Sequence, residues 1–244
     1  MDDIYSIHEL TMVFDGQRVL DVHRLAIGGN RLHILTGANG AGKSTLLNVL
    51  AFLTPPTSGQ VTFAGAPVPW GSPSLFRLRR NVTLMQQFPY LFSGSVFENV
   101  AYGLGVRGMG TAEQRQRVDA ALAQTNLGSF ARRNALQLSG GEIRRVAMAR
   151  ALALKPRVLL LDEPLANVDH ETARLLESLI ISLPRQGVCT IMTTHEPNHA
   201  DRLGGKTIHL VAGGIGQADL IAERPIPAGI GVPVHQIAAS AATL

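Results

Sequence analysis

The feature that most constrains the fold of this 244-residue chain is a glycine-rich loop between a short apolar run and a run with helical patterning. The loop, residues 37–44, has the sequence GANGAGKS and matches the pattern G-x-x-x-x-G-K-[ST]. Residues 32–36 before it have the character of a strand, and residues 45–53 after it have that of a helix. A strand, a glycine-rich loop and a helix in this order predict an α/β core.

This arrangement predicts a cradle for phosphate groups. Glycines let the backbone N–H groups point inward, and the following helix presents the positive end of its dipole to the anion. We expect Lys43 to reach the β and γ phosphates of ATP and Ser44 to bind Mg²⁺. An ordinary glycine-rich turn is the alternative, but the flanking strand and helix favour the cradle. The predicted nucleotide-binding residues of this loop are Gly37, Ala38, Asn39, Gly40, Ala41, Gly42, Lys43, Ser44 and Thr45.

A second predicted strand ends in two carboxylates. Residues 158–161, VLLL, are typical of a strand that is buried on both faces of a parallel sheet. Asp162 and Glu163 follow directly, at the edge where α/β sheets place their ligand sites. We assign Asp162 to the Mg²⁺ site and Glu163 to the base that orients and polarises the attacking water. In isolation the pair would be interpreted as a solvated turn before Pro164, and the phosphate cradle favours the functional interpretation.

Residues 138–142, LSGGE, begin a run with helical patterning that extends to residue 154. Ser139 is a favourable N-cap residue, and the two glycines expose backbone N–H groups at the positive end of the helix dipole. An ordinary N-cap is the alternative for these residues alone. Together with the phosphate cradle and the acidic strand end, the motif makes the chain resemble the ATP-binding-cassette (ABC) ATPase family over about residues 4–217.

The resemblance assigns roles to further residues. Gln87, favoured over Gln86 by the Q-x-P-x-L-F spacing, matches the family's glutamine that contacts Mg²⁺ and the attacking water. His195 matches the switch histidine that contacts the γ-phosphate. Phe14 lies where the family places an aromatic ring against adenine, with core packing as the alternative. Asp169 matches the end of the D-loop, although this chain has LANVD where SALD is usual. In the family, the ATP of a second protomer is contacted by the signature residues, here Leu138, Ser139, Gly140, Gly141 and Glu142.

The resemblance also implies the architecture and the assembly. It predicts a P-loop NTPase (RecA-like) core with a parallel sheet, an N-terminal antiparallel β subdomain and an inserted α-helical subdomain at about residues 88–155, with helical patterning over 111–124. We expect one ABC ATPase domain over residues 1–222 and an extension of unknown structure over residues 223–244. The implied activity is Mg²⁺-dependent ATP hydrolysis in a head-to-tail homodimer, where the signature of each protomer covers the ATP bound by the other.

The implied role is the motor of a bacterial importer with separate transmembrane permease subunits and, indirectly, an extracytoplasmic solute-binding protein. The permease would dock on residues 96–104, although about half of these side chains would instead belong to the core. Residues 96–108 resemble the motors of oxyanion importers for tungstate, molybdate or phosphate. The alternatives are an exporter or lipid-extraction ATPase, a soluble ABC protein acting on ribosomes or DNA, and a regulatory nucleotide-binding module without turnover. The solute itself is not encoded, because a motor subunit does not contact it.

Composition and charge restrict the setting. The net charge is only +4, without a dense Lys/Arg block, so we expect no nucleic-acid partner. No run approaches the roughly 18 apolar residues that span a bilayer. Residues 1–3 lack the basic start of a secretory signal. These features predict a cytoplasmic protein held at the inner face of the cell membrane through the permease. The single cysteine, Cys189, lies in an apolar run and is expected to be buried and inert.

Residues 195–199, HEPNH, also fit the zinc metalloprotease pattern H-E-x-x-H. That chemistry requires both histidines on one face of a helix, one turn apart. His195 follows an apparent strand, and Pro197 is more compatible with the start of a helix than with its interior. We therefore expect no zinc chemistry from this motif.

Overall fold

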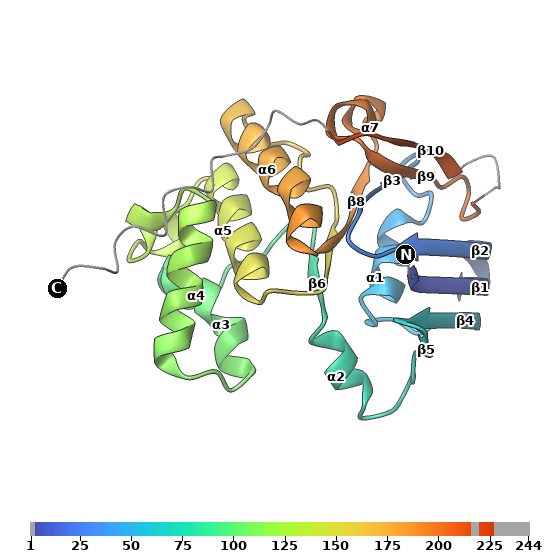
Figure 1. Ribbon diagram of the computed structural model, residues 1–244, viewed down its shortest axis with the longest axis horizontal. Helices are drawn as coiled ribbons and strands as arrows, with labels where there is room; N and C mark the ends of the chain where they lie inside the picture. Colours follow the sequence, from blue (N-terminus) through green and yellow to red (C-terminus); the bar gives the residue numbers. More distant parts are fainter. Residues whose placement is uncertain (1–2, 216–219, 227–244) are drawn as a thin grey trace.

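The computed structural model, which describes residues 3–215 and 220–226, confirms the predicted fold class. Within these residues the strands form an antiparallel sheet of four strands, in the order β2-β1-β4-β5, and a larger sheet of six. The antiparallel sheet and the helices α3, α4 and α5 lie at opposite ends of the molecule in Figure 1. The strands of the antiparallel sheet are β1 (Asp3–Phe14), β2 (Gln17–Gly28), β4 (Ser58–Phe63) and β5 (Ala66–Pro67).

The larger sheet has the order β10-β9-β3-β8-β7-β6, and all of its neighbouring strands except β10 and β9 pair in parallel. The register places Thr36 opposite Thr194 and Leu161 opposite Met192. The carboxyl ends of β3, β7 and β8 therefore meet at one edge of the sheet. The strands are β3 (Leu32–Thr36), β6 (Val82–Met85), β7 (Val158–Leu161), β8 (Cys189–Thr194), β9 (Gly205–His209) and β10 (Leu220–Arg224).

The helices agree with the predicted runs except at some ends. The predicted helix over 111–124 has the bounds of α4, and the run from 139 to 154 contains α5, for which Ser139 is the N-cap. The helix predicted over 45–53 begins earlier, at Lys43, because Gly42 caps it, and ends at Leu50. The α-helices are α1 (Lys43–Leu50), α2 (Leu75–Arg79), α3 (Val96–Val106), α4 (Thr111–Gln124), α5 (Gly140–Ala153), α6 (His170–Ser182) and α7 (Pro197–Leu203).

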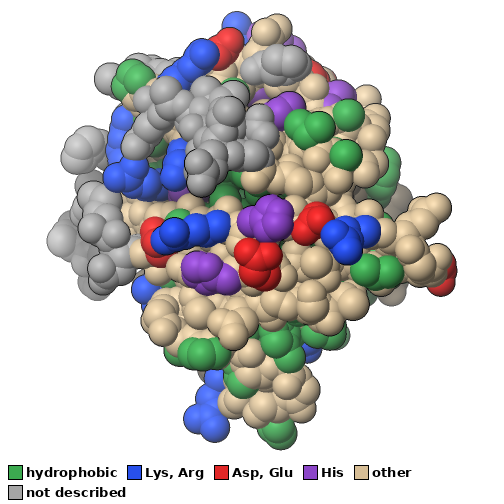
Figure 2. Space-filling model, turned by 90° about the vertical axis from the view of Figure 1, so that its right-hand side faces the viewer, with side chains coloured by type: hydrophobic (Ala, Val, Ile, Leu, Met, Phe, Trp, Pro, Cys, Tyr) green, Lys and Arg blue, Asp and Glu red, His purple; other side chains and the backbone are tan. Residues whose placement is uncertain are grey.

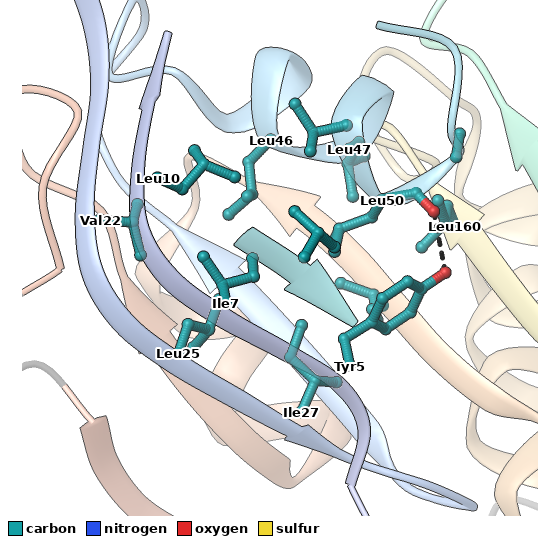
Figure 3. Packing of buried hydrophobic residues seen from close by; sticks show 14 of the residues in the cluster. Tyr5, Ile7, Leu10, Val22, Leu25, Ile27, Leu46, Leu47, Leu50 and Leu160 are labelled. Atoms are coloured by element: carbon teal, nitrogen blue, oxygen red, sulfur yellow. Dashed lines mark hydrogen bonds between the residues drawn. The ribbon is translucent and has the colours of Figure 1, made fainter. Parts of the chain in front are cut away.

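Helix α1 packs between the two sheets. Apolar side chains of β1 and β2 point toward Leu46, Leu47 and Leu50 of α1, and β7 contributes Leu160 from the other side (Figure 3). The buried Tyr5 hydroxyl donates a hydrogen bond of 2.8 Å to the Leu50 carbonyl, which would otherwise lack a partner at the end of α1. The core thus holds α1, and with it the glycine-rich loop, against β1 and β2.

Helix α5 belongs to two apolar clusters at once. Ala147, Met148 and Ala151 pack against the larger sheet together with α6, whereas Val146 and Ala149 pack against α3 and α4. A helix that is apolar on two sides is buried between two layers. Helix α5 therefore joins the helical end of the molecule to the sheet.

The side of the molecule at the right of Figure 1 carries acidic, basic and histidine side chains next to one another in one band (Figure 2). On β1 and β2, Arg18 forms an ion pair of 2.7 Å with Asp21, and His23 Nδ1 lies 3.0 Å from Glu9 Oε2. Exposed pairs of this kind contribute only about 0–1 kcal/mol each. This face therefore does not present a field of one sign.

Two glycines of the β3–α1 loop are required by their surroundings. Gly37 has φ 148°, and a Cβ there would lie 2.3 Å from the Leu210 carbonyl oxygen. Gly42 has φ 100°, and a Cβ there would lie 2.7 Å from Leu20 Cδ2 and 2.9 Å from the Val19 carbonyl oxygen. The loop thus lies too close to β2 and to the chain after β9 for any other residue at these positions.

The predicted extension over residues 223–244 is described only in part. Residues 223 and 224 end strand β10, which pairs antiparallel with β9, while residues 227–244 lie outside the described part of the chain. In the ranges 3–215 and 220–226, no helix has the length and apolar character that a membrane span requires.

Gly42→Ala should lower the free energy of unfolding by roughly 1–3 kcal/mol more than Gly40→Ala, because only the former meets packed atoms. Gly40 also has a positive φ, 79°, but a Cβ there has no atom within 4 Å. It therefore controls for backbone strain. Denaturant unfolding without nucleotide gives both values, and equal losses would contradict the proposed close packing.

Cys189 should be unreactive in the folded protein, because burial raises the pKa of its thiol to about 12 and only the thiolate is nucleophilic. At pH 8 we expect negligible reaction with a chromogenic disulfide reagent in buffer and full reaction in guanidinium chloride. Since Cys189 is the single cysteine of the chain, the signal reports this site alone. Rapid reaction in buffer would show that the β8 core opens.

Candidate nucleotide-binding and catalytic site

A cavity of about 570 Å³ lies where the loops after β3, β6, β7 and β8 come together. This is the edge that open α/β sheets use to bind ligands, because the carboxyl ends of parallel strands meet there. The residues that line the cavity are Val19, Asn39, Gly40, Gly42, Lys43, Ser44, Thr45, Gln87, Glu163, Asn167 and His195.

The cavity brings together most of the predicted nucleotide-binding loop and all three residues predicted to be catalytic. Phe14, which was predicted to stack on adenine, does not line it and is 46% exposed at the end of β1. Asp162, Asp169 and the signature residues 138–142 do not line it either. Val19 and Asn167 line it without having been predicted. Val19 had no signal in the sequence, whereas Asn167 could have been suspected from its place in the loop before Asp169.

The Lys43 side chain is buried and turns back over its own loop. Its ammonium group donates to the Gly37 carbonyl at 2.9 Å and to the Ala38 carbonyl at 3.1 Å. It also lies 3.9 Å from Glu163 Oε1. These contacts hold one positive charge at the N-terminal end of α1, where the helix dipole adds to it. The loop is thus suited to bind a polyanion.

The Glu163 carboxylate lies at the centre of the site and is almost completely buried. Its Oε2 atom is 2.9 Å from His195 Nδ1 and accepts a hydrogen bond of 3.4 Å from the Gln87 amide. The contacts come from the ends of three strands, β6, β7 and β8, so the fold itself brings the groups together. A buried carboxylate with donors on several sides can accept a proton from a water held beside it.

The chemistry of the oxygen donors fits Mg²⁺, which prefers carboxylate, hydroxyl and amide oxygens. Ser44 is exposed to the cavity and Gln87 lines it, while Asp162 follows β7 directly. Asp162 Oδ1 accepts a hydrogen bond of 2.7 Å from the Thr193 hydroxyl, which fixes the orientation of the carboxylate.

The signature residues lie at the exposed N-terminus of α5. The Ser139 hydroxyl accepts from the Glu142 N–H, and the Glu142 carboxylate accepts from the Ser139 N–H at 2.7 Å, a reciprocal capping box. The Ser139 N–H bond lowers the pKa of Glu142 by stabilising its charged form. Ser139 and Gly140 are exposed, so a second molecule can reach this helix end.

Asp169 caps α6 and contacts the signature from inside the same chain. Its Oδ1 accepts from the Thr172 N–H at 2.9 Å, and this bond lowers the pKa of Asp169. A Cβ added to Gly141 would lie 2.5 Å from Asp169 Oδ2. The second glycine of the signature thus lies against the side chains of Asp169 and Thr172, which would have to shift to admit a Cβ there.

The two histidines of the HEPNH segment point to different partners. His195 binds Glu163, whereas the buried His199 accepts or donates a hydrogen bond of 2.7 Å with the Thr194 hydroxyl. Helix α7 begins at Pro197, so His195 precedes it and the two imidazoles do not share a helical face. Burial lowers the pKa of His199. His195 thus belongs to the cavity, and His199 supports the strand end behind it.

Comparison with known proteins identifies the family of this chain. The sequence profile of the family described as ABC transporter matches residues 20–166. The tungstate uptake system ATP-binding protein TupC of Peptoclostridium acidaminophilum is 36% identical over 215 residues, 88% of this chain and 97% of the relative. The spermidine/putrescine import ATP-binding protein PotA of Marinobacter nauticus is 37% identical over 215 residues, but the match spans only 57% of its length.

A solved structure shows the same architecture. The ATP-binding cassette MJ0796, in a dimeric post-hydrolysis state bound to ADP and Pi, superposes with a TM-score of 0.80 at 29% identity. The match covers 87% of this chain and 97% of that one. The family profile spans more than half of the chain. This chain therefore belongs to the ABC transporter family, as one of its ATP-hydrolysing subunits.

Proposed function

We propose that this ATPase binds ATP in the cavity at the carboxyl edge of the sheet and hydrolyses it with Glu163 as the base. Lys43 binds the β and γ phosphates, and His195 contacts the γ-phosphate. Gln87 and Glu163 orient the attacking water, whose proton moves toward Glu163. The observation that carries this proposal is the convergence of Lys43, Gln87 and His195 on the buried Glu163 carboxylate. Phe14, exposed at the end of β1, remains our candidate for contact with adenine.

Mg²⁺ would be held by Ser44, Asp162 and Gln87. When bound, it neutralises charge on the phosphates as they react. The protein contributes the orientation of the three oxygen ligands and the exclusion of bulk water from the buried Glu163.

We further propose that two copies assemble head to tail, with the exposed Ser139–Gly140 end of α5 covering the γ-phosphate bound by the other copy. The signature does not line the cavity of its own chain, which supports a role toward another molecule. MJ0796 was solved as a dimer. Because the γ-phosphate contributes to the interface, ATP binds the dimer better than ADP does, and hydrolysis favours its opening.

The proposed role in the cell is to power solute import through separate transmembrane permease subunits. The aromatic surface, which we define as Tyr90, Phe92 and Tyr102, supports docking of a partner. These side chains are 70%, 39% and 56% exposed, and the Phe92 and Tyr102 rings lie 4.7 Å apart. Arg150 of α5 donates to the Tyr90 carbonyl and lies over Phe92. About half of the predicted docking segment instead faces the core, at Val96, Asn99, Val100 and Leu104.

For the solute we propose an oxyanion such as tungstate. The support is that the chain spans 97% of the length of the tungstate uptake ATPase and only 57% of the polyamine one. In such a system the protein would lie on the inner face of the membrane, bound to the permease. An extracytoplasmic solute-binding protein would act on the far side without touching this chain.

Glu163→Gln should lower kcat for ATP at least roughly 100-fold, because the amide cannot accept the proton of the attacking water. Binding of ATP should persist, so the variant should accumulate an ATP-dependent dimer. Phosphate release and size-exclusion chromatography with Mg²⁺ and ATP measure the two effects. A variant that stays monomeric at saturating ATP would contradict the head-to-tail assembly, and one that retains turnover would contradict the role of Glu163.

Tyr102→Glu should abolish co-purification with membrane subunits, because a charge in the aromatic surface opposes burial against a partner. The matched control is Phe76→Glu, an equally exposed aromatic side chain, 56%, on α2. Tagged wild type and both variants are purified from detergent-solubilised membranes of the source organism, and bound subunits are identified by mass spectrometry. An importer permease with a solute-binding protein supports the proposal, whereas exporter subunits, or none with the wild type, would contradict it.

A further inference from the structure

The main chain of Glu163 has an unusual conformation. Its φ is 45°, in the left-handed region that residues other than glycine rarely adopt. Glu163 follows shortly after the end of β7 at Leu161, and its carboxylate faces Lys43, Gln87 and His195. A strained backbone persists only where its surroundings hold it. The peptide groups on either side of Glu163 are held by two buried side chains that the proposed mechanism does not use.

Thr193 holds the N–H side of this residue. Its hydroxyl accepts a hydrogen bond of 2.8 Å from the Glu163 N–H and donates one of 2.7 Å to Asp162 Oδ1. Thr193 lies in β8 beside β7 and has no exposed surface. One hydroxyl thus uses its donor and an acceptor position to fix the two neighbouring acidic residues relative to each other.

Arg144 holds the carbonyl side. One nitrogen of its guanidinium, Nη1, donates to the Glu163 carbonyl at 3.0 Å, the Pro164 carbonyl at 3.2 Å and the Ala166 carbonyl at 2.6 Å. The other, Nη2, donates to the Gln87 carbonyl at 2.9 Å. The side chain is buried, and burial lowers its pKa, an effect that the nearby Glu163 charge opposes. A fixed planar fork with several donors suits this cluster of carbonyls.

Two other arginines in the described part of the chain each bind a single carbonyl group. Arg79 donates twice to the Phe52 carbonyl, and Arg107 donates to the Leu154 carbonyl at the far end of α5. Arg144 differs because it joins two loops that line the cavity, the one after β6 and the one after β7. It starts from α5, one turn beyond the exposed Ser139. Arg144 therefore holds the loops after β6 and β7 in place relative to each other.

From this geometry we propose that Arg144 and Thr193 are positioning residues for ATP hydrolysis, which hold the Glu163 main chain so that its carboxylate faces the attacking water. The inference rests on the proposed role of Glu163. It predicts that either side chain can be lost with little effect on ATP binding but with a large effect on turnover. Neither residue lines the cavity that we propose for ATP.

The first test compares Arg144→Gln and Arg144→Lys with the full-length wild type. We expect kcat per nucleotide-binding site to fall roughly 10- to 100-fold, because small displacements of a reacting group have effects of this size. KM for ATP should change less than about threefold. Lysine should not restore kcat, because it lacks the planar fork. The matched control is Arg107→Gln, which removes the hydrogen bond from Arg107 to the Leu154 carbonyl at the end of α5. This variant should keep wild-type kcat.

The second test uses the hydroxyl of Thr193. Thr193→Val keeps the shape of the side chain and removes the hydrogen bonds, so kcat should fall roughly 10-fold or more. Thr193→Ser keeps the hydroxyl and should restore most of the turnover. If Thr193 only filled space in the β8 core, Thr193→Ser would lower kcat more than Thr193→Val, because serine leaves a cavity and valine does not.

Equilibrium binding of ATP in the absence of Mg²⁺ gives the fraction of competent sites for each variant. Losses of turnover that match losses of binding sites would overturn the inference, as would Thr193→Val with wild-type kcat. Glu163→Gln is assayed in parallel. If it retains turnover, the proposed function fails. If it loses turnover while Arg144→Gln and Thr193→Val keep theirs, only the positioning role fails.

Discussion

The parallel pairing of β3, β7 and β8 determines where the chemistry of this chain takes place. The register places Thr36 of β3 opposite Thr194 and Leu161 of β7 opposite Met192, so the loops that follow these strands share one edge of the sheet. Lys43, Glu163 and His195, which are far apart in the sequence, meet there. A shift in the pairing of any one strand would separate the groups, and the apolar residues that bury both faces of the sheet oppose such a shift.

The left-handed main-chain conformation of Glu163 has a cost that the surrounding hydrogen bonds offset. A non-glycine residue in a left-handed conformation costs about 1–3 kcal/mol. A hydrogen bond from a charged donor to a buried acceptor contributes about 1.5–3 kcal/mol, and Arg144 makes one with the Glu163 carbonyl itself. The contacts of the guanidinium can therefore outweigh the strain, and the arginine in turn remains charged in a buried place because carbonyl dipoles surround it. The backbone strain of Glu163 and the hydrogen bond that offsets it therefore act on the same residue.

Local patterns in the sequence predicted the parts of the fold that local physics determines. The apolar run of β7, the glycine-rich loop and the capped start of α5 were each recognisable, because propensity, capping and periodicity act over a few residues. The role of Arg144 was not recognisable, since a basic residue on a helix is usually solvated. Thr193 was likewise hidden in a strand. Their importance comes from contacts with segments distant in the sequence, and Val19 joined the cavity for the same reason.

Helix α5 connects these observations, because its two apolar sides and its polar N-terminus each contact a different layer. One side packs on the sheet, the other on α3 and α4, and Arg144 projects from its first turns to the loops of the catalytic cavity. Near the opposite end, Arg150 contacts the aromatic surface. A packed helix moves as a rigid element more readily than it bends. A displacement of α5 by a partner at the aromatic surface, or by a second copy at Ser139, would therefore be transmitted through Arg144 to the Glu163 carbonyl and the Gln87 loop together.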